Sequence, residues 1–265
     1  MQYSRSAQVA IWIYVVVVLV LLYLPIFPPI ATSISPTGRQ PAIDSVTFKW
    51  YAQLANNPML IESIKTSIKV ALMVGFITPL LALSAALAVR ELKVPRVILL
   101  LMLLPLFIPG ISLGLANAFF FQQADIAPSF WTILVVHVLW ALPFAFLIVL
   151  TAISTFDPVY LESAYVHGAN RWQAFMTVEL PNILPGVLAS ATFSVILSFN
   201  ETVRTSLVQG PLNTVQTYIW SRYLQVGLSP STYALMSLLI LITLVLIAGL
   251  LIFNLRKGGS ERLNA

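Results

Sequence analysis

The sequence predicts an all-α membrane protein, a bundle of six transmembrane helices. Of its 265 residues, 59% are hydrophobic and 9% are charged, whereas ordinary soluble domains are about 25% charged. A soluble globule of this composition would lack the polar side chains that cover its surface, and a disordered chain would need fewer apolar residues. The apolar runs are continuous and do not alternate with polar residues, which excludes a transmembrane β-barrel.

Six apolar runs are each long enough, or nearly so, to cross a bilayer core of about 30 Å. We expect one transmembrane domain over residues 1–265, with helices at about 9–30, 70–89, 97–121, 130–153, 183–203 and 233–253. The first run follows Arg5, as in a signal peptide, but it is longer than the about 7–15 apolar residues of such a peptide. We therefore expect it to be retained as the first membrane helix.

Lysine and arginine residues indicate the orientation of the helices. Segment 90–96, between the second and third helices, holds three of these residues, and so does the tail at 256–262. Segment 122–129 holds Asp125 and no cation. Because short cytoplasmic loops are rich in lysine and arginine, we expect both termini in the cytoplasm. Segment 31–69 then lies outside despite its four cations, but long loops follow the rule poorly.

The chain offers few groups for metal or catalytic chemistry. It has no cysteine and two histidines, His137 and His167, so neither a disulfide framework nor a thiolate or histidine metal site is expected. A membrane-embedded enzyme would need clustered His, Asp or Glu near one membrane face. An ion-coupled secondary transporter would predict intramembrane acids and an internal repeat, and it stays open as the alternative. No catalytic residue and no metal ligand are assigned, and the net charge of +5 is interpreted as an orientation signal, without a nucleic-acid partner.

The loop between the fourth and fifth helices, residues 155–181, is longer than a plain connection needs. Asp157 followed by Pro158 predicts the start of a helix, with an acidic N-cap and a proline in the first turn. Gly168 predicts the end of that helix, and Asn170 can cap a second one. Pro181 is expected to open the next membrane helix. We therefore expect two short helices joined at Gly168.

Each of these short helices carries an apolar stripe at i, i+3 and i+4. One interpretation is that the stripes pack on the protein's own helix ends or lie at the lipid surface. The other is that they form a docking surface for a cytoplasmic partner, because exposed aromatic clusters mark such surfaces. The stripes consist of Leu161, Ala164 and Tyr165 in the first helix, and Trp172, Phe175 and Met176 in the second.

The spacing within this loop resembles the signature of permease subunits of ATP-binding-cassette importers. Glu162-Ser163-Ala164 is followed by three residues, Gly168, nine residues and Val178-Glu179-Leu180-Pro181. The family pattern is Glu-Ala-Ala, three residues, Gly, nine residues and Ile-x-Leu-Pro, and this chain departs from it at Ser163 and Val178. The resemblance implies a coupling helix that inserts into a cleft of the ATPase. The implied ATPase-coupling residues are Leu161, Glu162, Ser163, Ala164, Tyr165, Gly168, Trp172, Leu180 and Pro181.

The resemblance extends over most of the chain, which is similar to spermidine/putrescine-type permeases. It is carried by residues 48–51 with 56–57, 198–201, 208–211, 226–230 and 234–235. It implies a MetI-like permease fold, with an N-terminal helix and a five-helix core that forms half of a pore. The family's members carry polyamines, and their relatives carry opines, phosphonates, iron and other small solutes.

The resemblance also implies the partners and the location of the chain. They are a second, homologous permease, a homodimer of ATP-binding-cassette ATPases, a periplasmic substrate-binding protein and the lipid of the bacterial inner membrane. The chain has no Gly-x-x-x-x-Gly-Lys-Ser/Thr phosphate loop, so ATP and Mg are expected in the partner ATPase. No cofactor is expected on this chain.

Five residues are candidates for the substrate pathway: Asn200, Glu201, Arg204, His137 and Trp140. Charged groups near membrane segments are costly and usually functional. Glu201 and Arg204 lie three residues apart, so the alternative to a path-lining role is a mutual salt bridge. For His137 the alternative to a ligand is a hydrogen bond between helices. An acid suits a cationic cargo and an arginine suits an anionic one, so both cargo charges stay open.

Two further features predict local structure. Pro105, Pro109, Gly110 and Gly114 predict a kink in the third helix, because proline lacks the backbone N–H that a helix needs. Such a kink can line a gate or be tolerated as plain packing. The segment 213–230 predicts either a short amphipathic helix at the membrane surface or an ordinary interfacial loop.

Overall fold

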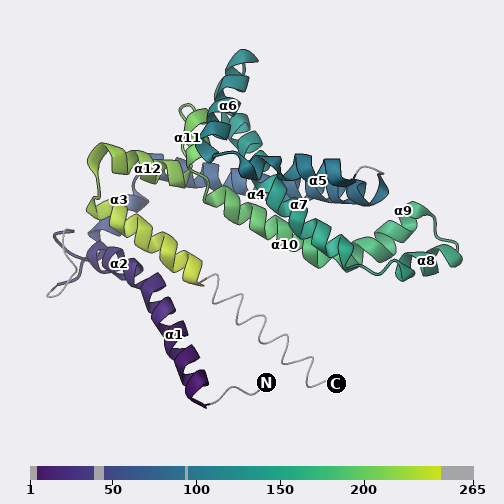
Figure 1. Ribbon diagram of the computed structural model, residues 1–265. Coiled ribbons are helices and arrows are strands. Elements are labelled where there is room, and N and C mark those ends of the chain that lie inside the picture. Colours follow the sequence, from purple (N-terminus) through teal and green to yellow (C-terminus); the bar gives the residue numbers. More distant parts are fainter. Residues whose placement is uncertain (1–4, 39–44, 93–94, 246–265) are drawn as a thin grey trace. The chain divides into compact units, whose positions relative to one another are not determined.

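The computed structural model describes residues 5–38, 45–92 and 95–245, and every regular element in these ranges is a helix (Figure 1). The chain divides into two compact units, Met1–Pro58 with Arg222–Ala265, and Met59–Ser221. Lys93, the tail residues 256–262 and the predicted end of the last span at residue 253 lie outside the described residues.

The first unit contains the two ends of the chain. Its elements are α1 (Arg5–Tyr23), η1 (Leu24–Ile26), α2 (Phe27–Ser33), α3 (Lys49–Ala55) and an apolar helix at Pro230–Val245. Elements α1 to α2 form one continuous apolar stretch of 29 residues, as the first predicted span requires. No side chain of α1 is buried, which suits a helix whose surroundings are lipid.

A tyrosine joins three segments of this first unit. The hydroxyl of Tyr51 in α3 lies 2.7 Å from Ser33 Oγ at the end of α2. The same hydroxyl donates to Ser237 Oγ in the helix Pro230–Val245 at 3.1 Å. The neighbouring Trp50 donates from its ring nitrogen to the carbonyl of Ser35 at 2.8 Å. The aromatic pair at positions 50 and 51 therefore fixes the segment that follows the first span.

The second unit is a helical core. Its elements are α4 (Pro58–Glu91), α5 (Pro95–Leu103), η2 (Leu104–Phe107), α6 (Gly110–Gln123), α7 (Phe130–Ser154), α8 (Val159–Val166), α9 (Arg171–Ala174), the π-helical η3 (Phe175–Glu179), α10 (Leu180–Phe199), α11 (Val203–Val208) and α12 (Val215–Val226). Helices α7 and α10 run antiparallel and lie side by side along their lengths (Figure 1).

Two buried apolar clusters hold α4 and α7 together. The first lies toward the C-terminal ends of these two helices, and it also includes Ile183 of α10. The second lies toward the opposite ends and is built from α4 and α7. The buried members are Ala82, Ala86, Ala145, Phe146, Val149, Ile153 and Ile183 in the first, and Val70, Val74, Ile133, Leu134, Val138 and Ala141 in the second.

The second helix is longer than predicted. The absence of charge predicted a span at 70–89, but α4 runs from Pro58 to Glu91. Its first turns carry an exposed ion pair between Lys65 and Glu62, with 2.7 Å between Nζ and Oε1. Such a pair at i, i+3 stabilises a helix that continues beyond its apolar part. The helix therefore continues past the charged residues at which the predicted span ended.

The kinked helix predicted at 97–121 is divided into two helices in the structure. Pro95–Phe107 and Gly110–Gln123 meet at a bend of 103°. At the break, Ile108 and Pro109 have extended ψ angles of 126° and 135°. The kink predicted from Pro105 and Pro109 is confirmed, but it is sharper than a bend within one helix.

The fifth helix is shifted relative to the predicted range of 183–203. Helical structure continues without interruption over Arg171–Phe199, so it begins inside loop 155–181. It ends at Phe199, and a separate helix, α11, starts at Val203. Segment 213–230 contains the helix α12 (Val215–Val226), so the helical alternative is confirmed, and its place at the membrane surface stays a prediction.

The structure contains four helices long and apolar enough to span a membrane, up to five if the bent pair counts as one span, and the shorter helix Pro230–Val245, all among the described residues. The architecture is thus an all-helical membrane bundle, and the count of six spans stays a prediction.

Close packing between α7 and α10 generates a test of stability. A Cβ added at Gly186 would lie 2.4 Å from Ala152 Cβ, which is closer than two carbon atoms in contact can approach. Gly186→Ala should lower the free energy of unfolding by about 1–2 kcal/mol, because overpacking outweighs the gain in helix propensity. The measurement is thermal unfolding of the purified protein in detergent.

The matched control adds Ala152→Gly to the same protein. This change removes the methyl group with which the new Cβ collides, so the double variant should recover much of the lost midpoint temperature. A Gly186→Ala protein as stable as the wild type would show that α7 and α10 are not in this close contact.

Candidate functional site

Loop 155–181 forms the first predicted short helix, α8, and the second, α9, begins at Arg171 as expected but continues through η3 into α10. The prediction that Pro181 opens a separate helix is therefore wrong, because a π-helical turn joins the two segments. The side chain of Asp157 accepts a hydrogen bond from the backbone N–H of Val159 at 3.0 Å, at the start of α8. Gly168 has a φ of +87°, a left-handed conformation that glycine adopts without strain. Asn170 and Gln173 form a capping box at the start of α9, with bonds of 2.9 and 3.0 Å. Local signals therefore determine this loop.

The apolar stripes of the loop are only partly covered. Leu161, Ala164 and Phe175 are half-buried, whereas Tyr165 and Trp172 are 46% and 66% exposed. The first interpretation, packing on the protein's own helix ends, therefore accounts for part of the stripes, and an aromatic surface remains. Among the other predicted coupling residues, Glu162, Ser163 and Pro181 are exposed and Leu180 is half-buried.

A cleft of about 750 Å³ lies between this loop and the ends of α4 and α7. Leu161 and Tyr165 of α8 line one side of it, and Leu87 and Arg90 of α4 line another. Glu179 also lines the cleft and forms an ion pair with Arg90. The sequence analysis missed this pair. A signal for it was available in the sequence. Glu179 is an acidic residue within the mainly apolar stretch 174–183, and the basic segment 90–96 was expected at the same membrane face.

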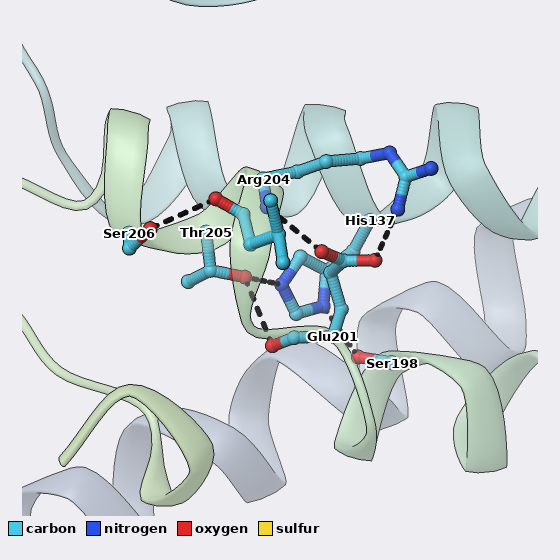
Figure 2. Close-up of polar contacts among 7 residues, drawn as sticks. His137, Ser198, Glu201, Arg204, Thr205 and Ser206 are labelled. Carbon is cyan, nitrogen blue, oxygen red and sulfur yellow. Dashed lines mark hydrogen bonds and ion pairs between the residues drawn. The ribbon is translucent and has the colours of Figure 1, made fainter. Parts of the chain in front are cut away.

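A second polar cluster lies where α10 ends and α11 begins (Figure 2). Glu201 and Arg204 form an ion pair with 2.6 Å between Oε2 and Nη1. The other carboxylate oxygen of Glu201 accepts the backbone N–H of Arg204 at 2.8 Å, which caps α11. Both residues are buried, at 4% and 6% exposure. The salt bridge predicted as one alternative for these residues is confirmed.

His137 connects the two sides of the helix break. Its Nδ1 lies 2.8 Å from Ser198 Oγ in the last turn of α10. Its Nε2 lies 2.7 Å from Thr205 Oγ1 in α11. The predicted hydrogen bond between helices is therefore confirmed, and both ring nitrogens are occupied. The sequence analysis missed both hydroxyl partners, because serine and threonine are common in membrane helices and carry no spacing signal.

The guanidinium of Arg204 is held between an aromatic ring and a glycine. Its Cζ lies 3.8 Å from the centroid of the Trp140 ring, a cation–π contact. A Cβ added at Gly110 would lie 3.0 Å from Arg204 Nη2, so the start of α6 lies directly against the charge. Among the described residues, Arg204 Nε is a buried donor without a hydrogen-bond partner. The arginine is therefore firmly packed but not fully satisfied.

The cluster unites four of the five candidate pathway residues, and Asn200 stays apart from it. Asn200 is exposed and donates from Nδ2 to the carbonyl of Ile196 at 2.8 Å, within its own helix end. Glu201 and Trp140 each contact Arg204, and His137 is linked to Glu201 through Thr205, whose hydroxyl donates to the Glu201 carbonyl at 3.2 Å. Among the described residues, no group of three or more His, Cys, Asp and Glu side chains is arranged to hold a metal ion.

Comparisons with known proteins agree with this architecture. The family model of the binding-protein-dependent transport system inner membrane component matches residues 78–258. The spermidine/putrescine transport system permease protein PotC of Escherichia coli K12 is 28% identical over 232 residues, which cover 85% of this chain and 86% of PotC. The PotC protein of Haemophilus influenzae is 23% identical over 236 residues, which cover 88% of this chain and 92% of that PotC.

A solved structure has the same fold over nearly the whole chain. It is a bacterial ABC transporter involved in the import of the acidic polysaccharide alginate, with a TM-score of 0.69, 15% identity and coverage of 95% of this chain and 98% of that chain. Since the family model matches more than half of the residues, the chain belongs to the family of binding-protein-dependent transport system inner membrane components, the permease subunits of ABC importers.

Proposed function

We propose that this chain forms half of the translocation pathway of an ABC importer and that loop 155–181 docks on the ATPase subunit. The observation that carries this proposal is the exposed aromatic surface of the loop, formed by Tyr165 and Trp172, in a chain of this family. Large exposed aromatic residues on a short structured loop favour burial by a protein partner. ATP hydrolysis then takes place in the partner.

The proposed partners follow from the same family. They are an ATPase homodimer, a second homologous permease and a periplasmic binding protein, in a bacterial inner membrane with both termini in the cytoplasm. A solved structure of the same fold supports the binding-protein partner. It is a bacterial alginate ABC transporter in complex with an alginate pentasaccharide-bound periplasmic protein. Its TM-score is 0.63 at 17% identity, and the match covers 94% of this chain and 93% of that chain. The alternative, an ion-coupled secondary transporter, requires no ATPase, so co-purification with a soluble ATPase distinguishes the two.

The proposed cargo is a small organic cation or a zwitterion with an amine. PotC of E. coli is named for spermidine and putrescine transport. Glu201 is the acid nearest to the expected path, and Trp140 adds an aromatic face of the kind that attracts cations. Arg204 neutralises Glu201 in this structure. A cationic cargo would therefore have to compete with Arg204 for the carboxylate.

Replacement of Gly168 tests the docking of loop 155–181. No atom lies within 4 Å of a Cβ added at Gly168, and its φ is +87°. Gly168→Asp should therefore cost about 1–2 kcal/mol of local backbone strain without disturbing the packing of the permease. We expect the protein to insert normally, to retain less ATPase on purification and to lose uptake. Glu162→Ala should act in the same direction more mildly, because it removes one exposed polar contact.

Gly227→Asp is the matched control for this test. Gly227 also has a positive φ, of +71°, and open space around an added Cβ, but it follows α12 and lies outside the loop. This variant should keep both ATPase and uptake. Full ATPase retention and full uptake by Gly168→Asp would remove the main support for a coupling role of the loop.

Neutralisation of Glu201 tests the charge of the cargo. Glu201→Gln keeps an acceptor for the backbone N–H of Arg204 and removes the negative charge. We expect uptake of spermidine to fall by about tenfold or more, with assembly of the ATPase unchanged. Glu62→Gln is the matched control, because Glu62 forms the same i, i+3 ion pair with Lys65 on an exposed face of α4. Normal spermidine uptake by Glu201→Gln would exclude Glu201 from the pathway.

Single cysteines test the orientation, because the natural chain contains none. We expect an impermeant thiol reagent added to intact cells or spheroplasts to label Asp125→Cys but not Lys93→Cys or Gly168→Cys. The reason is the concentration of lysine and arginine in segment 90–96. Permeabilised cells provide the control that all three positions can react. Labelling of Gly168→Cys from outside would reverse the proposed topology.

A further inference from the structure

We propose that Arg90 and Glu179 tie α4 to loop 155–181, so that a displacement of the loop moves α4 together with α10. The inference rests on the proposed function in one respect, that the ATPase acts on this loop. It assigns a positioning role to two residues outside the loop's recognised motif positions. It also adds α4 to the helices through which the loop acts, beyond α7 and α10, to which the loop is covalently joined.

The ion pair joins residues far apart in sequence at the junction of loop and core. The guanidinium of Arg90, at the end of α4, contacts both carboxylate oxygens of Glu179, and the Nη2–Oε2 distance is 3.3 Å. Glu179 is 2% exposed, whereas the Arg90 side chain is 36% exposed. A carboxylate this deeply buried needs a fixed partner, because an unpaired buried charge is strongly unfavourable.

A backbone irregularity turns Glu179 toward this partner. Residues Phe175–Glu179 form a π-helical turn directly before α10. The buried positions Ala174, Glu179 and Ile183 are therefore spaced by five and then four residues. A regular helix would bring position 178 rather than 179 onto the face of Ala174. π-Helical turns are rare and frequently lie at functional sites, so the placement of the carboxylate is a specific feature of this loop.

Apolar and polar contacts both connect α4 to the loop. Phe156 and Leu180 of the loop pack against the cluster that includes Ala82 and Ala86 of α4, and the cleft of about 750 Å³ is lined by Leu87 of α4 and by Leu161 and Tyr165 of α8. The ion pair crosses at the edge of this opening. Loop helices α8 and α9 lie at the end of α10, as Figure 1 shows. A moving loop would thus pull on α4 in part through Arg90.

Stability alone is a weak reason for such a pair. A well-packed apolar pair often stabilises a protein as much as a buried salt bridge, whereas two charges with fixed geometry specify one arrangement. Glu91 offers an internal comparison. It also pairs with Arg90, at 3.3 Å between Nε and Oε1, but its side chain is 61% exposed and belongs to α4 itself. It therefore cannot connect α4 to the loop.

The test uses nitroxide spin labels in the assembled transporter, with its ATPase and second permease. Ser84 in α4 and Thr192 in α10 are matched label sites, because both are exposed and each hydroxyl bonds the carbonyl four residues earlier. Each is changed to cysteine in a chain that has no other. Label mobility is compared between the nucleotide-free and the vanadate-trapped ATP states, so the experiment needs no knowledge of the cargo.

We expect both labels to respond to ATP in the otherwise natural protein. Glu179→Gln should weaken the response at Ser84→Cys and keep the response at Thr192→Cys, with ATPase retention unchanged. Arg90→Gln should reproduce this result, but Glu179→Gln is the better tolerated change, because it leaves a partly solvated arginine and no unpaired buried carboxylate. Glu91→Gln, the matched control, should leave both responses as they are.

Three results would overturn the inference. The first is a response at Ser84→Cys that is undiminished in both Glu179→Gln and Arg90→Gln, or a natural protein in which Thr192→Cys responds and Ser84→Cys does not. The second is an equal loss in Glu91→Gln. The third is a failure of both pair variants to accumulate in the membrane, which would assign the pair to folding alone. A natural protein in which neither label responds would instead contradict the proposed coupling role of the loop.

Discussion

Buried charges and broken helices in this protein depend on one constraint: polar groups within a membrane bundle must find partners inside the protein. The clearest case is the break between α10 and α11. The chain leaves the helix at Phe199 and resumes it at Val203, which frees backbone groups. Glu201 then caps the new helix through the backbone N–H of Arg204, and the Arg204 side chain neutralises the carboxylate. His137 holds the two helix ends together through two hydroxyl groups.

The same constraint governs the opposite end of α10. There the irregular segment is a π-helical turn, and the buried group is Glu179, which Arg90 neutralises from α4. Between these two ends, α10 packs closely on α7, where Gly186 meets Ala152. The helix is thus a regular, closely packed rod whose two irregular ends are each fixed by an ion pair. Neither end can shift without separating charges that are buried or partly buried.

Local features of this structure could be predicted from the sequence, and distant contacts could not. The two helices of loop 155–181, the positive φ of Gly168 and the pairing of Glu201 with Arg204 depend on residues within a few positions of one another. The length of α4, the bend of 103° after Phe107 and the π-helical turn depend on packing and on competing hydrogen bonds. The Arg90–Glu179 pair joins residues 89 positions apart. The sequence offers an acidic residue and a basic segment expected at the same membrane face, but only the fold identifies Arg90 as the partner of Glu179.

The two ion pairs differ in their contact with water, and this difference bears on which end of α10 can rearrange. The side chains of Arg204 and Glu201 are 8% and 5% exposed, and Trp140 covers the guanidinium. Separating this pair would leave both charges without solvent, which is costly. Arg90, by contrast, is 36% exposed and also bonds Glu91, so separating it from Glu179 would leave one charge, the carboxylate of Glu179, without solvent or a partner. The end of α10 that joins loop 155–181 is therefore the end where movement costs less, which is the property required of a junction that transmits motion.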